Sequence, residues 1–447
     1  MDFSFGDEDE ELRGRARTWL TEHLAGPYAR ARGLGGPGSG HEEVEVRRAW
    51  ERELGRGGWI GQGWEVPAGT YGQQRLSLTG QVVWAEEYAA LRAPGRAGHI
   101  GENLLAPTLV AHGTREQRDR FLPGIARGEE LWCQGYSEPG AGSDLADIRT
   151  AAVRDRADGR YRVTGQKIWT SLARDADWCF VLARTEPGSR RQRGLSFLLV
   201  RMDQPGRVEV RPIRQMSGTS EFNEVFFDGA VAAEAVGAEG DGWTVAMGLL
   251  ALERGVSTLV QQIGFAAELE RVLAAYAACA APATATATAT VPASATASAS
   301  ATASATGSAP AASPASGPAP DGATAAARAH DPVLRERLVR QWAELRTMRW
   351  NALRTLGAAG GPGAPNVAKL LWGGWHRRLG ELAVEVRGAA ASAGGAAWAP
   401  GLPYELGLDE GQRLFLFTRA DTIYGGSDEI QRNIIAERVL GLPKEPR

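Results

Sequence analysis

The sequence has little cysteine, no excess of positive charge and no long hydrophobic run. Its 447 residues include 3 cysteines, and 50 Lys and Arg are balanced by 53 Asp and Glu, which gives a formal net charge of -3. Proteins usually bind nucleic acids and anionic membrane surfaces through basic patches, and a net charge close to zero makes such a patch less expected. We therefore expect no nucleic-acid partner and no membrane partner, while small acidic or neutral ligands stay open.

The cysteines and the first residues bear on the cellular compartment. Cys133, Cys179 and Cys279 lack the spacing of a metal site, and three cysteines cannot all pair with one another. We expect no metal ion. The opening stretch MDFSFGDEDEEL is acidic where a secretory signal is basic, and no apolar run reaches the length of a membrane span. These features predict a cytoplasmic protein.

The arrangement of apolar residues predicts three domains in an α+β fold. Residues 7–24 and 77–91 have the three- and four-residue spacing of amphipathic helices, and Ser77 is a candidate N-cap of the second. Between about Leu131 and Val236 the pattern changes to short β-type runs at 161–171, 178–184, 195–202 and 223–232. Helical spacing returns from Gly242. We predict an N-terminal helical domain at 1–128, a β-domain at 129–238 and a C-terminal helical bundle at 239–447.

A low-complexity segment interrupts the predicted bundle. Between Ala281 and Pro320 every residue except Val291 is Ala, Thr, Ser, Pro or Gly. Such a segment has no large side chain to bury, and its prolines oppose both helix and strand. We expect residues 281–322 to form a disordered surface loop between two helices.

Two stretches have the residue types of a binding site for a flat ligand. In QGYSEPGAGSD, glycines let the backbone approach a ligand closely, and Ser137 and Ser143 supply hydroxyl groups. An ordinary turn is the alternative. In GQKIWTS, a strand places Trp169 and Ser171 on one face, because side chains two apart point the same way. An aromatic plane beside a hydroxyl suits an isoalloxazine ring, although a Trp in a strand is more often part of a core.

In this order the two stretches resemble the acyl-CoA dehydrogenase family. The similarity extends to residues 102–144, to VRPIRQMSGTSEFNEVFFDGA and to the closing IYGGSDEIQRNIIAERVLGLP. The resemblance implies an N-terminal helical domain, a central β-barrel domain and a C-terminal helical bundle, with FAD between the last two and a neighbouring subunit. By residue-wise match, the implied FAD contacts are Gln134, Tyr136, Ser137, Gly142, Ser143, Trp169, Ser171, Gly426 and Ser427.

The same resemblance raises a question about the catalytic base. Members of the family remove an α-proton from an acyl thioester with a carboxylate while the β-hydrogen passes to the flavin as hydride. Most of them have a Glu directly after the Tyr of the final motif, where this chain has Gly425. Some members take the base from an earlier helix, at the position that Glu253 matches, so we predict Glu253 as the base.

The surroundings of Glu253 in the sequence fit this role. An apolar stripe runs along the predicted helix and Glu253 lies at its edge; the stripe consists of Val245, Leu249, Leu252, Val256, Val260 and Ile263. A carboxylate in an apolar place is desolvated, which makes it a stronger base. A Glu bordering such a stripe is otherwise usually structural. We expect Asp428 and Glu429, which follow Ser427, to cap a helix.

Two family features are missing. No Arg-x-x-Phe-Gly motif follows the helix of Glu253, and GAAASAGGAAW at 388–398 replaces the expected Gly-Gly-x-Gly loop. The flavin-ring side of the site is therefore expected to be retained and the adenosine side altered. Similar bacterial members act on bulky substrates, some of them as mixed two-gene tetramers.

Three functions remain open from the sequence. The first is FAD-dependent α,β-dehydrogenation of an acyl thioester, on coenzyme A or an acyl carrier protein, with electrons passed to an electron-transfer flavoprotein or similar acceptor. The second is a flavin monooxygenase or oxidase on the same fold. The third is a supporting subunit of a mixed tetramer. We expect either a homo-oligomer or a mixed tetramer with a related chain.

Overall fold

The computed structural model describes residues 5–36, 42–280, 331–356, 363–391 and 408–444. Within its helices, the side chains of residues 252–260, 279–280, 355–356 and 389–390 lie outside the description. The predicted loop at 281–322 and most of the segment 388–398 also fall outside it, so both stay predictions. No helix in the described part has the length and apolar composition needed to cross a membrane.

The N-terminal part consists of helices, and α3 and α5 among them begin at side-chain caps. They are α1 (Asp7–His23), η1 (Gly26–Ala31), α2 (Val44–Arg56), α3 (Leu78–Ala90), η2 (Gly101–Leu105), α4 (Ala106–His112) and α5 (Arg115–Ala126). The Ser77 hydroxyl accepts a hydrogen bond from the Gly80 N–H at the start of α3, which confirms the predicted cap. Thr114 and Gln117 form a reciprocal capping box at the start of α5.

The middle part is a seven-stranded sheet that closes on itself. Its members are β1 (Trp132–Gly135), β2 (Ala151–Arg154), β3 (Tyr161–Ser171), β4 (Trp178–Arg184), β5 (Leu195–Arg201), β6 (Val208–Pro212) and β7 (Phe222–Val236), with the short helix η3 (Leu145–Asp147). The strands pair in the order β1-β4-β2-β3-β7-β5, β6 adds to β7, and a β4–β5 pairing closes the ring. The closed ring of β4, β2, β3, β7 and β5 confirms the predicted barrel, and β1 and β6 each add to it on one side.

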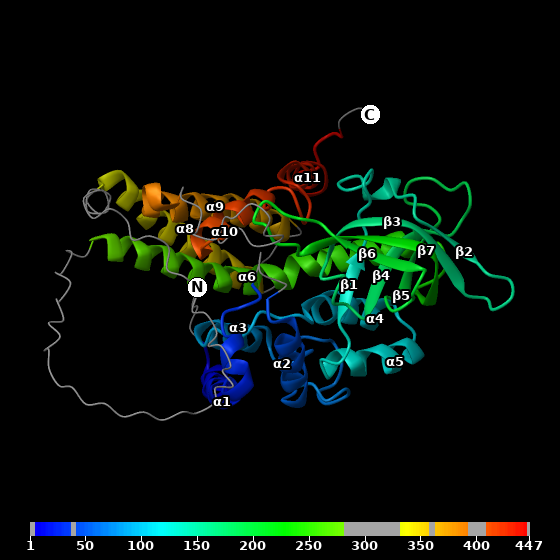
Figure 1. Cartoon of the computed structure of the whole chain (residues 1–447), viewed down its shortest axis with the longest axis horizontal. Helices are drawn as coiled ribbons and strands as arrows, with labels where there is room; N and C mark the ends of the chain where they lie inside the picture. Colours follow the sequence, from blue (N-terminus) through cyan, green and yellow to red (C-terminus); the bar gives the residue numbers. More distant parts are fainter. Residues whose placement is uncertain (1–4, 37–41, 281–330, 357–362, 392–407, 445–447) are drawn as a thin grey trace, which may run out of the picture.

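The C-terminal part is again helical. Helix α6 (Gly242–Ala280) leads from the barrel into a bundle with α8 (Pro332–Leu356) and α9 (Ala364–Arg387) (Figure 1). The chain then forms η4 (Gly388–Ala391), α10 (Glu410–Phe417), η5 (Thr418–Ala420), α11 (Asp428–Ile434) and η6 (Ile435–Val439). In the order of helices, barrel and helices the fold is the α+β class predicted from the sequence.

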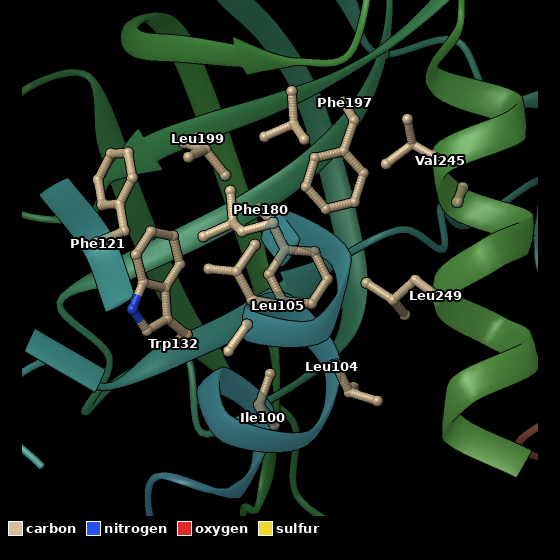
Figure 2. Close-up of a cluster of buried hydrophobic side chains, with 14 of the residues drawn as sticks. Ile100, Leu104, Leu105, Phe121, Trp132, Phe180, Phe197, Leu199, Val245 and Leu249 are labelled. Atoms are coloured by element: carbon tan, nitrogen blue, oxygen red, sulfur yellow. The ribbon is translucent and has the colours of Figure 1, made fainter. Parts of the chain in front are cut away.

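One hydrophobic core joins α6 to the barrel and to the N-terminal helices. Val245 and Leu249 of α6 point toward Phe197 of β5 and Leu104 of η2 (Figure 2), and all four side chains are buried. Burying such side chains stabilises the fold by about 1.5–3 kcal/mol each. The first turns of α6 are therefore fixed against both neighbouring parts of the molecule.

Candidate functional site

The loop after β1 is a tight turn that exposes its glycines. The backbones of Glu138 and Ala141 exchange two hydrogen bonds, of 3.1 and 3.0 Å, which closes the turn around Pro139 and Gly140. Gly142 is exposed, with no protein atom within 4 Å of the place where a side chain would begin. Of the other predicted contacts in this loop, Ser143 is exposed, Gln134 and Ser137 are half-buried and Tyr136 is buried. The loop thus offers open backbone to a ligand.

A buried ion pair fixes this loop to β3. The Lys167 ammonium donates to a Glu138 carboxylate oxygen at 2.9 Å and to the Tyr136 carbonyl at 3.0 Å. The same carboxylate accepts from the N–H groups of Arg149 and Thr150 at 2.6 and 2.8 Å. Burial by itself raises the pKa of Glu138, but the Lys167 charge and these hydrogen bonds outweigh it and hold that pKa below its usual value. The loop is therefore anchored by an ionised carboxylate.

Strand β3 brings its aromatic residue to the same place. The Ile168 N–H donates to the Ser137 carbonyl at 2.9 Å, so the two motifs lie side by side although they are distant in the chain. The register with β7 slips between Lys167 and Thr170, which is a β-bulge. Trp169 lies in the bulge with a φ of 59°, a left-handed conformation that is rare for a bulky residue.

The bulge turns the Trp169 ring out of the core. Trp169 is 55% exposed, whereas Thr170 beside it is fully buried and Ser171 is half-buried. The only ring recorded against Trp169 within the described residues is that of Phe222, edge to face with centroids 6.1 Å apart. Strained backbone that exposes a large aromatic residue is typical of functional positions. Trp169 is thus available as a wall for a flat ligand.

The third predicted stretch forms a turn before α11. Gly425 and Gly426 have φ values of 64° and 82°, which only glycine adopts easily. The side-chain amide of Gln431 donates to both of their carbonyls at 3.2 and 3.0 Å. The Ser427 hydroxyl accepts from the Ile430 N–H, so Ser427 is the N-cap of α11, whereas Asp428 and Glu429, which we predicted to cap this helix, lie in its first turn.

This turn lies near the end of β3. The Leu172 N–H, directly after Ser171, donates to the Glu221 carbonyl at 3.1 Å. Burial raises the pKa of the Tyr424 phenol well above its usual value, and the carboxylates of Asp421 and Glu221 raise it further. Since Glu221 contacts the end of β3 and also acts electrostatically on Tyr424, the fold brings the third stretch toward the first two.

The predicted base lies on α6 within the stretch whose side chains are outside the description. The helix backbone continues through position 253, one turn after the buried Leu249. Of the predicted apolar stripe, Val245, Leu249 and Ile263 are buried. Glu253 therefore remains a prediction.

Two groups of charged residues stand outside the predicted set of site residues. The burial of Lys167 could have been predicted from the sequence. Side chains on a strand alternate between its two faces, so Lys167 lies on the same face of β3 as the buried Tyr161 and Val163. The second group, His376 with Glu268 and Asp421, comes from three elements far apart in the chain, and no short motif marks it. No cluster of three or more His, Cys, Asp or Glu in the described ranges could hold a metal ion.

The described residues fit a flavin ring. No hydrogen bond within the described part of the chain engages the hydroxyl groups of Ser137 or Ser171, so both are available to a ligand beside the Trp169 plane. The open backbone at Gly142 and the exposed Ser143 beside it suit a group that approaches closely. Adjacent aromatic and hydrogen-bonding surfaces of this kind match the apolar faces and polar edge of an isoalloxazine ring.

Comparisons with known proteins agree with this geometry. Three family models match: acyl-CoA dehydrogenase N-terminal domain over residues 6–129, middle domain over 133–230 and C-terminal domain over 322–440. Acyl-CoA dehydrogenase IpdE1 of Mycobacterium tuberculosis is 49% identical over 443 residues, covering 98% of this chain and 99% of the relative. The protein of the same name from Mycolicibacterium smegmatis is also 49% identical, over 449 residues and with the same coverage.

Solved structures show the same likeness. The Tcur3481-Tcur3483 steroid ACAD has a TM-score of 0.74 and 25% identity, with 100% of both chains covered. The ChsE4-ChsE5 complex from Mycobacterium tuberculosis has a TM-score of 0.71 and 28% identity, again with 100% of both chains covered. The chain is an oxidoreductase that belongs to the acyl-CoA dehydrogenase family.

Proposed function

We propose that this protein catalyses the FAD-dependent α,β-dehydrogenation of an acyl-CoA that carries a bulky, ring-bearing acyl group. The observation that supports this function best is that the loop after β1, which contains Ser137, is held beside the exposed Trp169. The Ile168 N–H donates to the Ser137 carbonyl, and Lys167 pairs with Glu138. The bulky substrate rests on the likeness to a steroid ACAD at 25% identity. An acyl carrier protein is the alternative carrier of the acyl group.

The roles of the residues follow from their chemistry. When bound, FAD supplies the acceptor for the β-hydrogen, which leaves the substrate as a hydride. Trp169 gives the ring an apolar wall, Ser137 and Ser171 offer hydroxyl groups to its polar edge, and the open backbone at Gly142 and Ser143 receives the cofactor closely. Gln134 and Tyr136 line the start of the loop. Gly426 and Ser427 are assigned to the adenosine half of FAD.

Glu253 is proposed to take the α-proton. Gly425, the alternative position for the base, has no acid and a left-handed backbone that disfavours one. One side of α6 just before position 253 is buried in apolar core through Val245, Ala246 and Leu249, whereas Leu250 is half-buried and Ala251 is exposed. A carboxylate in such surroundings accepts a proton from carbon more readily than one in water.

The test is anaerobic bleaching of the flavin absorbance by a panel of acyl-CoA esters. Glu253→Gln is expected to lower the bleaching rate by about 10²-fold or more, since a positioned general base contributes that much. The matched control is Glu270→Gln, a change of the same kind at an exposed position on the same helix, which is expected to leave the rate unchanged. Bleaching at the wild-type rate in Glu253→Gln would remove Glu253 from the mechanism.

The same preparation separates the alternative functions. Rapid oxygen consumption with each turnover would favour an oxidase or monooxygenase over a dehydrogenase that passes electrons to an electron-transfer flavoprotein. A chain that binds FAD only together with a related chain would favour the mixed tetramer, an arrangement suggested by the two-component names of the similar solved complexes. If the chain forms a homo-oligomer that binds FAD, then FAD binding does not require a related chain. The cytoplasm remains the predicted compartment.

A further inference from the structure

One face of helix α9 carries a buried stripe of polar residues and glycines. The stripe consists of Asn366, Lys369, Gly373, His376 and Gly380, spaced three and four residues apart, so they lie on the same side of the helix. The three polar members are between 2% and 5% exposed. Polar groups are seldom buried this completely unless each has partners.

The partners of Asn366 and Lys369 lie on either side of Gly425 and Gly426 in the chain. The Asn366 amide donates to the Gln431 side chain at 2.7 Å, and Gln431 holds the carbonyls of the glycine turn. The Lys369 ammonium donates to the Asp421 carbonyl. Gly373 allows close approach, because a side chain there would begin 3.1 Å from the same carbonyl oxygen. The stripe therefore supports the turn from behind.

His376 differs from the other members because it contacts two elements. Its Nδ1 lies 2.8 Å from a carboxylate oxygen of Asp421, and its Nε2 lies 2.7 Å from a carboxylate oxygen of Glu268 on α6. A neutral imidazole has one N–H, so only the imidazolium form donates to both carboxylates. Burial by itself lowers the pKa of His376, but Glu268 and Asp421 outweigh burial and raise that pKa to about 9.

The bridge continues to the residue before the glycine turn. The Tyr424 hydroxyl donates to the other oxygen of Asp421 at 2.6 Å. The Lys369 ammonium lies 5.4 Å from the centre of the Tyr424 ring. The charged and titratable groups around His376 are thus Glu268 from α6, Lys369 from α9, and Asp421 and Tyr424 from the final segment, with Glu221 of the barrel acting on Tyr424.

We propose that His376 is a positioning residue for the cofactor: as an imidazolium it ties α6 to the final segment and so holds the turn at Gly425–Ser427 in the shape that receives the adenosine half of FAD. This inference rests on the proposed function. It also offers a substitute for the missing Arg-x-x-Phe-Gly motif, since the adenosine side would be ordered from within the chain by Glu268, His376 and Asp421.

The experiment measures FAD affinity and backbone protection on the same full-length variants. We expect His376→Gln to raise the Kd for FAD about tenfold, the effect of losing a hydrogen bond between charged groups. Hydrogen exchange of the amides at 421–431 is expected to accelerate, and excess FAD is expected to restore the wild-type KM for the acyl-CoA. Raising the pH past about 9 should weaken FAD binding to the wild type and not to His376→Gln.

The matched control removes another ion pair of α9. Glu344→Gln breaks the contact with Arg378 on the outer side of the helix and is expected to leave FAD affinity and exchange at 421–431 unchanged. Faster exchange in His376→Gln with an unchanged Kd for FAD would overturn the inference, because the bridge would then be purely structural. A wild-type chain that takes up no FAD, either alone or together with a related chain, would instead contradict the proposed function.

Discussion

At the scale of single residues, the buried pair of Glu138 and Lys167 carries the geometry of the site. Lys167 is fully buried and contacts the loop carbonyl of Tyr136 as well as Glu138. Removing one partner of a buried pair leaves a charge without compensation, which costs far more than the pair contributes when intact. The ion pair that anchors the loop after β1 is therefore also a determinant of stability.

This predicts a large effect of Lys167→Met. The free energy of unfolding is expected to fall by about 3 kcal/mol, because Glu138 stays buried without its cation. The free energy of unfolding is measured by urea denaturation, monitored by circular dichroism. Glu209→Gln, which breaks the exposed pair with Arg211 on β6, is the control and is expected to cost less than about 1 kcal/mol. Equal losses in the two variants would contradict the role of burial.

Single residues also show what the sequence predicted and what it did not. The sequence alone shows that position 425 is a glycine and carries no carboxylate. The left-handed backbone at this position is the physical reason for a glycine there. Trp169 was expected on the ligand side of a regular strand with Ser171. The bulge that turns its ring outward depends on pairing with β7, which lies more than fifty residues later in the chain.

At the scale of elements, helices α6 and α9 are joined by charge as well as by apolar packing. Phe265, Trp375 and Leu379 bury apolar surface between them, and His376 bridges Glu268 to Asp421 at the edge of that core. Apolar packing responds little to pH, whereas the bridge depends on the protonation of His376. The contact between the two helices should therefore weaken in alkaline solution.

The direction of this pH effect follows from the raised pKa of His376. Its contribution to the free energy of unfolding is complete below the unfolded value of 6.5 and is lost as the pH rises through about 9. The loss is about 3 kcal/mol over this window. Urea midpoints of wild type and His376→Gln, compared between about pH 6 and pH 9.5, should converge as the pH rises. Parallel curves would show that His376 does not titrate in this window.

At the scale of the whole molecule, ion pairs join parts that lie far apart in the chain. Arg48 of α2 donates to the Asp175 carbonyl at 2.6 Å and to both carboxylate oxygens of Asp177, each at 3.0 Å, beside β4. Arg349 of α8 pairs with Glu86 of α3. The N-terminal helices are thus connected by charged contacts both to the barrel and to the bundle.

Arg48→Ala is therefore expected to loosen the N-terminal helices from the barrel. We expect a loss of about 1.5–3 kcal/mol, the value of hydrogen bonds to charged groups, and a broader thermal transition in calorimetry because the parts no longer unfold together. Arg115→Ala removes an exposed arginine paired with Asp119 within α5, and its transition should match that of the wild type. An equally sharp transition in Arg48→Ala would show that packing alone couples the parts.

The sequence by itself determined the order of helical, β and helical parts, the helix cap at Ser77, the helix start after Ser427 and the resemblance to the acyl-CoA dehydrogenase family. These features depend on local spacing and residue chemistry, which can be read along the chain. Only the tertiary structure decided the closure of the barrel, the bulge at Trp169, the Glu138–Lys167 anchor and the bridge through His376. Each of these depends on contacts between residues distant in sequence, and their energies arise from burial and charge pairing that no local pattern specifies.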